Sequence, residues 1–132
     1  MLAIADEGEI GIDVELDQAT ADEPALVARY FSPAEVASWN ALPHTERQSR
    51  FLYAWTRKEA ILKALGCGLQ LEPSGIDAGI ELRDIDVAVA VEGRPRTVRV
   101  QTLVIDSSAI VSVARIVAVA DSPTFAAIAA YT

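Results

Sequence analysis

The sequence is poor in cysteine, and it lacks the long apolar segments that membrane spans and signal peptides need. The single cysteine, Cys67, excludes an internal disulfide and is typical of a protein from a reducing cytoplasm. No apolar run approaches the roughly 18 residues of a membrane-spanning helix. Residues 1–7 lack the positive start and long apolar region of a signal peptide. We therefore expect a cytoplasmic protein that has no membrane partner.

Basic residues are also scarce. There are 11 Lys and Arg against 19 Asp and Glu, so the net charge is −8. A charge of this sign argues against nucleic acids and anionic membranes as partners. The exception is the segment 43–66, which carries five basic and two acidic residues. We expect an anionic ligand to bind there, and Arg47, Arg50 and Arg57 suggest a basic patch for an acidic protein.

What the sequence does contain is the patterning of one α+β domain over residues 1–132. Alternating apolar residues predict an N-terminal hairpin and a C-terminal antiparallel meander, packed against a helical block with one long helix. Ser32, Pro33 and Glu35 form a typical helix start with a capping box, and Gly66 a helix end. The expected strands are 2–5, 10–16, 87–91, 97–105 and 109–119; the expected helices are 23–31, 33–42 and 45–65. Segment 125–131 fits a strand or a helix equally well.

The segment 10–16 holds the first chemical candidates. Ile10, Ile12, Val14 and Leu16 alternate with Gly11, Asp13 and Glu15, so the two carboxylates share one face of a strand with Cα atoms about 6.5–7 Å apart. Like charges at that spacing repel each other. Taken alone, the pattern is typical of a strand with its acidic face in water; the alternative is a cation between the two acids.

The expected long helix carries a second group of charges, Lys58, Glu59 and Lys63, within the stretch 55–66. Glu59 and Lys63 are four residues apart in the order that favours an ion pair on a helix surface. An exposed salt bridge of this kind contributes only about 0.3–0.5 kcal/mol. This helix alone therefore does not distinguish a solvated face from a binding site.

Together, the two segments resemble the 4′-phosphopantetheinyl transferase superfamily. Its signature is G-[IV]-D, followed downstream by W-x-x-K-E-[AS]-x-x-K. The matching positions in this chain are Gly11, Ile12, Asp13, Trp55, Lys58, Glu59, Ala60 and Lys63. The intervening stretch 31–35, FSPAE, resembles the family as well. The resemblance is detailed over about residues 2–70, and it implies the family's fold as a single half-unit.

The resemblance also implies a reaction and its residues. Such enzymes move the phosphopantetheine arm of coenzyme A, their co-substrate, onto a serine of an apo carrier protein in fatty acid, polyketide or nonribosomal peptide synthesis, and release 3′,5′-ADP. It implies Mg²⁺ ligands at Asp13, Glu15 and Glu59, and coenzyme A phosphate contacts at Lys58 and Lys63. We expect catalytic roles for Glu59, Glu15 and Lys63. Glu59 is our choice of general base and Glu15 the rival.

The short length has two interpretations. The wording of the motifs resembles the C-terminal half of the longer, surfactin-synthetase-activating type. We expect a homo-oligomer, a dimer or a trimer, that completes the site between subunits; the alternative is a non-catalytic module that binds coenzyme A or a carrier protein. His44 is expected at the surface or in a cap, Cys67 in a loop, and Trp39 and Trp55 in the core.

Overall fold

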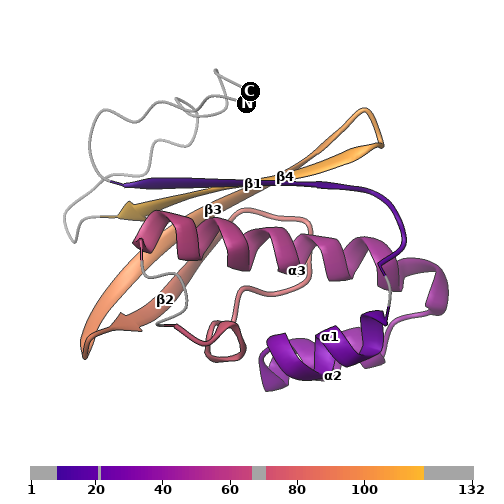
Figure 1. Ribbon diagram of the computed structural model, residues 1–132, viewed down its shortest axis with the longest axis horizontal. Helices are drawn as coiled ribbons and strands as arrows, with labels where there is room; N and C mark the ends of the chain where they lie inside the picture. The colour runs from indigo at the N-terminus through magenta and orange to yellow at the C-terminus, as the bar shows by residue number, and fades with distance from the viewer. Residues whose placement is uncertain (1–8, 21, 67–70, 118–132) are drawn as a thin grey trace.

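The computed structural model describes residues 9–20, 22–66 and 71–117. A four-stranded antiparallel sheet forms one layer, and a helix of 22 residues, α3 (His44–Leu65), lies across it (Figure 1). Helices α1 (Glu23–Tyr30) and α2 (Pro33–Asn40) lie together beside α3 (Figure 1). The predicted α+β class is confirmed, with the long helix as its centre.

The strands are β1 (Ile10–Leu16), β2 (Ile85–Val91), β3 (Arg94–Ile105) and β4 (Ala109–Val117), in the order β1-β4-β3-β2. The last three form the predicted meander. The first strand pairs with the last, so that Asp13 lies opposite Ser112 and Glu15 opposite Ile110. This long-range pairing brings the N-terminal acidic strand beside the last strand, at an edge of the described sheet. The other half of the predicted hairpin, 2–5, and the segment 125–131 lie outside the described residues.

Local signals set the helix boundaries. The Ser32 side chain accepts a hydrogen bond from the backbone of Glu35, and the Glu35 carboxylate accepts one from the backbone of Ser32, which completes the predicted capping box. Helix α3 ends at Gly66, whose φ of 67° is the left-handed conformation of a helix C-cap. Helix α2 ends at Asn40, two residues earlier than predicted.

Two apolar clusters hold the layers together. The C-terminal half of α3, including Ala60, Ile61 and Ala64, packs on Val87, Val98 and other residues of the sheet. The N-terminal half, including Phe51 and Leu52, packs on α1 and α2. Trp39 is buried, as predicted. Within the described residues, no helix is both long and apolar enough to cross a membrane.

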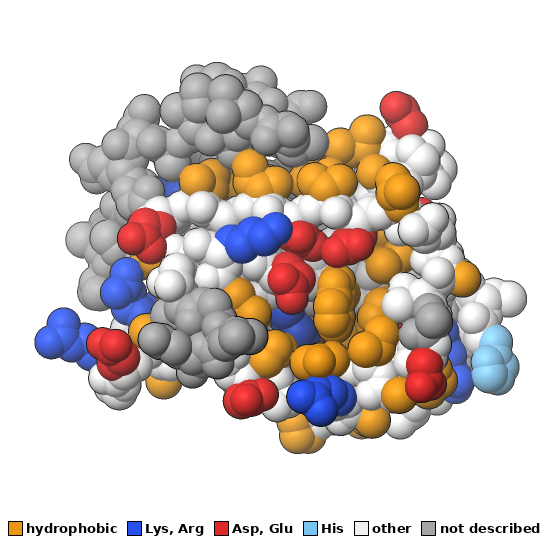
Figure 2. Space-filling model, in the orientation of Figure 1, with side chains coloured by type: hydrophobic (Ala, Val, Ile, Leu, Met, Phe, Trp, Pro, Cys, Tyr) orange, Lys and Arg blue, Asp and Glu red, His pale blue; other side chains and the backbone are white. Residues whose placement is uncertain are grey.

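The orientation of β1 differs from the expectation of a wet acidic face. Its Gly11, Asp13 and Glu15 side faces α3, whereas Val14 and Leu16, on the opposite face, are 48% and 59% exposed. On that opposite face Ile10 and Ile12 pack with Val111 and Val113 in a separate cluster. Figure 2 shows hydrophobic side chains in a row along β1. The sheet therefore has apolar residues on both faces, and the acids lie between the layers.

Candidate active site

The acidic strand and the long helix meet closely because Gly11 has no side chain. A Cβ atom at Gly11 would lie 2.1 Å from the carbonyl oxygen of Ala60 and 2.5 Å from the backbone nitrogen of Ala64. Real Cβ atoms do not approach backbone this closely, so only glycine allows β1 to lie against α3 at this point. Asp13 and Glu15 on β1 are thereby brought to Glu59 and Lys63 on α3.

Lys63 links the strand to the helix through Asp13. Its ammonium donates to Asp13 Oδ1 at 2.9 Å and to the carbonyl oxygen of Ile12 at 3.1 Å. The Lys63 side chain is about half exposed, whereas that of Asp13 is 10% exposed. The other Asp13 oxygen, Oδ2, is buried and has no hydrogen-bond partner among the described residues. The charge of the Asp13 carboxylate is therefore compensated at only one of its two oxygens.

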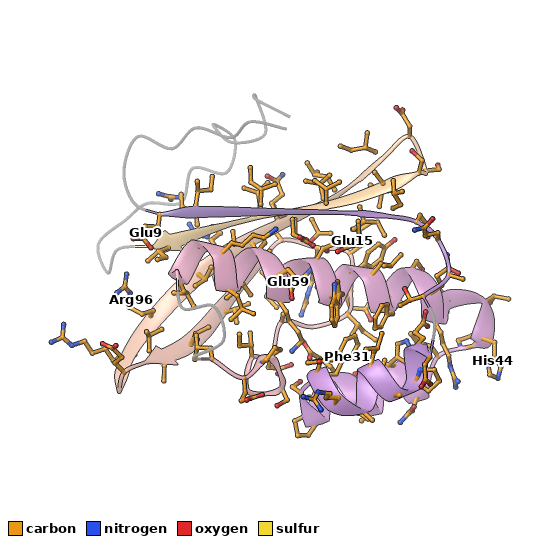
Figure 3. All side chains as sticks on the ribbon, in the orientation of Figure 1. Glu9, Glu15, Phe31, His44, Glu59 and Arg96 are labelled. Carbon is orange, nitrogen blue, oxygen red and sulfur yellow. The ribbon has the colours of Figure 1, made fainter. Side chains whose placement is uncertain are left out.

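Glu15 and Glu59 complete an acidic group at the seam between β1 and α3. Figure 3 shows them on the two elements, and Figure 2 shows acidic side chains gathered there beside a basic one. Burial, followed by repulsion from Asp13, raises the pKa of both carboxyls above the usual value. Lys63 opposes the rise in the pKa of Glu59. Two carboxyls with raised pKa values beside a third are typical of a site that binds a cation or moves a proton.

A cavity of about 620 Å³ opens beside this acidic group. Glu59, Leu62 and Lys63 of α3 form one wall, and the last turn of α1 and the segment 71–73 form others. The volume lies in the range of small-molecule sites. Trp55 also lines it, half-buried, and a hydrogen bond from this residue partly offsets the rise in the pKa of Glu15. Trp55 is therefore part of a cavity wall as well as of the apolar packing that was predicted.

Lys58 does not face solvent as a phosphate-binding lysine would. Its ammonium lies 2.7 Å from Glu35 Oε1, donates to the carbonyl oxygens of Pro73 and Ile76, and belongs to a side chain only 2% exposed. The second oxygen of Glu35 accepts hydrogen bonds from the backbone of Ala78 and Gly79. Burial lowers the pKa of Lys58, and Glu35 opposes this shift. The pair ties α2, α3 and the segment 73–79 together behind the cavity.

The basic patch expected from the arginines of α3 does not form. Arg57 is fully buried, and it donates hydrogen bonds to the carbonyl oxygens of Ala78, Gly79, Glu81 and Arg83 and to Thr102. Burial lowers its pKa to about 10. Arg47 packs over Trp39, and Arg50 pairs with Glu81. Their spacing places the three residues on one side of the helix, but each meets a different part of the fold along its length, which the local charge count did not reveal.

Several residues of the site carried no sequence signal that we used. Glu35 was predicted as a cap, but its contact with Lys58 joins segments that are distant in sequence. Arg29 and Tyr30 line the cavity from α1, and we did not single them out from the sequence. Exposed His44 begins α3 at the end away from Glu59 (Figure 3), in agreement with the prediction of a surface position. Cys67 lies outside the described residues.

The donor set suits Mg²⁺, which prefers oxygen ligands and commonly binds one or two carboxylates together with phosphates. Asp13 Oδ2 is buried and has no partner among the described residues, so a cation at this point would compensate its charge. As they stand, however, the described residues include no group of three His, Cys, Asp or Glu side chains that could hold a metal ion. The chemistry of the three carboxylates therefore fits Mg²⁺, but their three-ligand arrangement is not preformed.

Comparison with known proteins agrees with this picture. The chain is 43% identical over 61 residues to the 4′-phosphopantetheinyl transferase HetI of Nostoc, covering 46% of this chain and 26% of that protein. It is 38% identical over 65 residues to AcpT, a 4′-phosphopantetheinyl transferase of Escherichia coli, covering 49% and 33%. The matches thus span about a quarter to a third of the length of these relatives.

The fold is also similar to a solved structure, the holo-[acyl-carrier-protein] synthase of Thermotoga maritima. The superposition covers 82% of this chain and 62% of that one, with a TM-score of 0.55 and 19% sequence identity. At this identity the likeness concerns the fold. The sequence profile of one family matches residues 9–118, which include every motif residue discussed above. The chain belongs to the 4′-phosphopantetheinyl transferase superfamily.

Proposed function

We propose that this chain catalyses, or forms part of an enzyme that catalyses, Mg²⁺-dependent transfer of 4′-phosphopantetheine from coenzyme A to a serine of an apo carrier protein. The observation that carries the proposal is the meeting of Asp13 and Glu15 of β1 with Glu59 and Lys63 of α3, the last two of which line the cavity. Family membership supports the reaction class. A reducing cytoplasm, expected from the single cysteine, is the compartment we propose.

The reaction is a displacement at phosphorus. The serine oxygen of the carrier forms a bond to the phosphorus that bears the pantetheine, the bond from that phosphorus to the bridging oxygen breaks, and 3′,5′-ADP leaves. Mg²⁺ bound by Asp13, Glu15 and Glu59 would neutralise charge on the diphosphate oxygens. The serine proton must be accepted as the new bond forms.

We assign the proton to Glu59. It lies on α3 and lines the cavity, and a carboxylate can accept the proton directly or through a water. Glu15 is the rival, since it is a second carboxylate beside Asp13. Lys63 is about half exposed and has one ammonium hydrogen beyond the two that bond Asp13 and Ile12, which it can donate to a phosphate oxygen.

Lys58 receives a different role from the one first predicted. A contact with a coenzyme A phosphate would require its ammonium to leave Glu35 and two carbonyl oxygens. We therefore propose that Lys58 is a positioning residue. It holds the segment around Pro73, a wall of the cavity, against α3.

A second copy of the chain is part of the proposal. Within the described strands, β1 is at an edge of the sheet, and Val14 and Leu16 expose large apolar side chains there. Exposed apolar residues at a sheet edge are typical of a surface that packs against another subunit or domain. We propose a dimer or trimer in which a neighbouring copy completes the pocket around coenzyme A.

The alternative is a module that binds coenzyme A or a carrier protein without turnover. Full retention of the carboxylates and Lys63 favours the enzyme, because binding alone does not require three metal ligands.

The experiment is to incubate the purified chain with apo carrier proteins, coenzyme A and MgCl₂, and to follow the mass of each carrier. We expect an increase by one phosphopantetheine group, abolished by Asp13→Ala and by Glu59→Ala. If no carrier in a panel gains mass while coenzyme A still binds, the binding module is correct. Sedimentation of the active sample should show more than a monomer.

A further inference from the structure

The basic side chains around the cavity differ in how they are engaged. Three described lining residues carry a positive charge: Arg29, Lys58 and Lys63. Lys58 is buried in its pair with Glu35, and Lys63 is bonded to Asp13. Arg29 has neither an ion pair nor a guanidinium hydrogen bond within residues 9–20, 22–66 and 71–117. Its N–H groups are therefore available to a ligand in the cavity.

Arg29 is exposed, and one contact with a neighbouring ring restricts its guanidinium. Its guanidinium carbon lies 5.3 Å from the centre of the Tyr30 ring, a cation–π distance. The Tyr30 ring meets the edge of Trp55 at 5.5 Å, and Trp55 stacks on Phe51 at 5.7 Å. This series of rings connects Arg29 on α1 to the core of α3. Stacking over a ring face restricts the guanidinium plane but leaves its hydrogen-bonding edge free.

The charge balance of the cavity calls for such a residue. Glu59 and Glu72 line it, and Asp13 and Glu15 lie beside Glu59. An anionic diphosphate would be repelled by these acids unless cations offset them. Even with Mg²⁺ bound, the charge of the diphosphate exceeds what Lys63 alone can neutralise while it remains bonded to Asp13.

We propose that Arg29 binds a phosphate group of the donor substrate, from the wall of the cavity formed by α1. This rests on the proposed function, since it takes a coenzyme A-like diphosphate as the ligand. The planar guanidinium donates two parallel hydrogen bonds to phosphate oxygens, which a lysine cannot do. The donor diphosphate is thus held by groups of β1 and α3 on one side and by Arg29 of α1 on the other.

The test is calorimetric titration of coenzyme A, in the presence of MgCl₂, into the unsubstituted chain, Arg29→Gln, Arg29→Lys and Arg96→Gln. Arg96 is an exposed arginine on β3, away from Glu59 (Figure 3), so its substitution controls for net charge. We expect Arg29→Gln to weaken coenzyme A binding about tenfold or more, the usual effect of losing charged hydrogen bonds. Arg29→Lys should restore part of the affinity, and Arg96→Gln should match the unsubstituted chain.

Pantetheine, which has no phosphate, serves as the second probe. Its affinity should be the same for the unsubstituted chain and Arg29→Gln. Equal coenzyme A affinities for these two proteins, or an equal loss of affinity for pantetheine, would overturn the proposal for Arg29 and leave the proposed function intact. The proposal for Arg29 is also overturned if Arg29→Gln weakens binding of the carrier protein but not of coenzyme A. If the unsubstituted chain binds no coenzyme A, both proposals are wrong.

Discussion

The Lys63 ammonium of α3 lies 2.9 Å from Asp13 Oδ1 of β1, where it acts as a cation for a carboxylate that is nearly buried. Strand and helix are linked by this ion pair fifty residues apart in sequence. Because the second Asp13 oxygen has no partner among the described residues, the pair satisfies only half of the carboxylate. The metal-free chain therefore carries a partly compensated charge at its proposed active site.

Removal of the Lys63 charge tests how far the buried Asp13 carboxylate depends on this ion pair. We expect Lys63→Met to lower the free energy of unfolding in EDTA by about 1–3 kcal/mol, because Asp13 Oδ1 loses its charged donor. Addition of MgCl₂ should stabilise the variant more than the unsubstituted chain. Urea unfolding with and without MgCl₂ measures both effects. Arg96→Met, at an exposed site, is the control; a loss as large in that variant would contradict the prediction.

Gly11 offers a test of the contact between β1 and α3. A methyl group there would lie 2.1 Å from the Ala60 carbonyl oxygen, so Gly11→Ala must push the strand from the helix. We expect a loss of about 1–3 kcal/mol or more in the free energy of unfolding, as for other overpacked sites, and loss of Mg²⁺ binding. Gly75→Ala is the matched control, because a Cβ at Gly75 would meet no atom within 4 Å. Similar stability of the two variants would refute this account of the close contact.

The acidic group predicts a pH dependence. The pKa values of Glu15 and Glu59 are raised above 4.5 in the fold, by burial first and by Asp13 second. A carboxyl with a raised pKa stabilises the fold fully below its unfolded pKa, and this contribution is lost as the pH rises through the folded pKa. In EDTA, the unsubstituted chain should therefore lose stability relative to Glu15→Gln/Glu59→Gln between pH 4.5 and neutrality.

The control for this pH dependence is a carboxyl whose pKa is shifted in the opposite direction. A hydrogen bond from Arg99 lowers the pKa of Asp86 below 3.8, so the contribution of Asp86 is present above that pH and is lost as the pH falls through its folded pKa. The stability difference between Asp86→Asn and the unsubstituted chain should stay nearly constant from pH 4.5 to neutrality. Urea unfolding across this range provides the measurement. The prediction is wrong if the difference in unfolding free energy between the unsubstituted chain and Glu15→Gln/Glu59→Gln does not change with pH.

The buried pair of Glu35 and Lys58 should behave as one unit. Lys58→Met leaves Glu35 charged and without its cation in the interior, which costs about 3–5 kcal/mol for buried pairs. The double variant Glu35→Gln/Lys58→Met should recover part of this loss. The pair of Asp86 and Arg99 is the comparison: its carboxylate is about half exposed and its arginine 14% exposed, so Asp86→Asn should cost less than Lys58→Met. A small effect of Lys58→Met on thermal unfolding would speak against the positioning role.

Features of the fold that depend on neighbouring residues were readable from the sequence. The capping box of Ser32 and Glu35, the end of α3 at Gly66 and the meander of β2, β3 and β4 each rest on contacts within a few residues or across short turns. The motif also identified the residues that meet at the seam between β1 and α3.

The orientations of the charged side chains were decided by the tertiary structure. Asp13 and Glu15 face the helix because Gly11 allows α3 to pack on their side of β1, although alternation alone favours the apolar side. Adjacent residues on α3 have different environments: Lys58 is buried against Glu35, and Glu59 faces the cavity. A sequence determines which residues share a face, whereas packing between distant elements determines what that face meets.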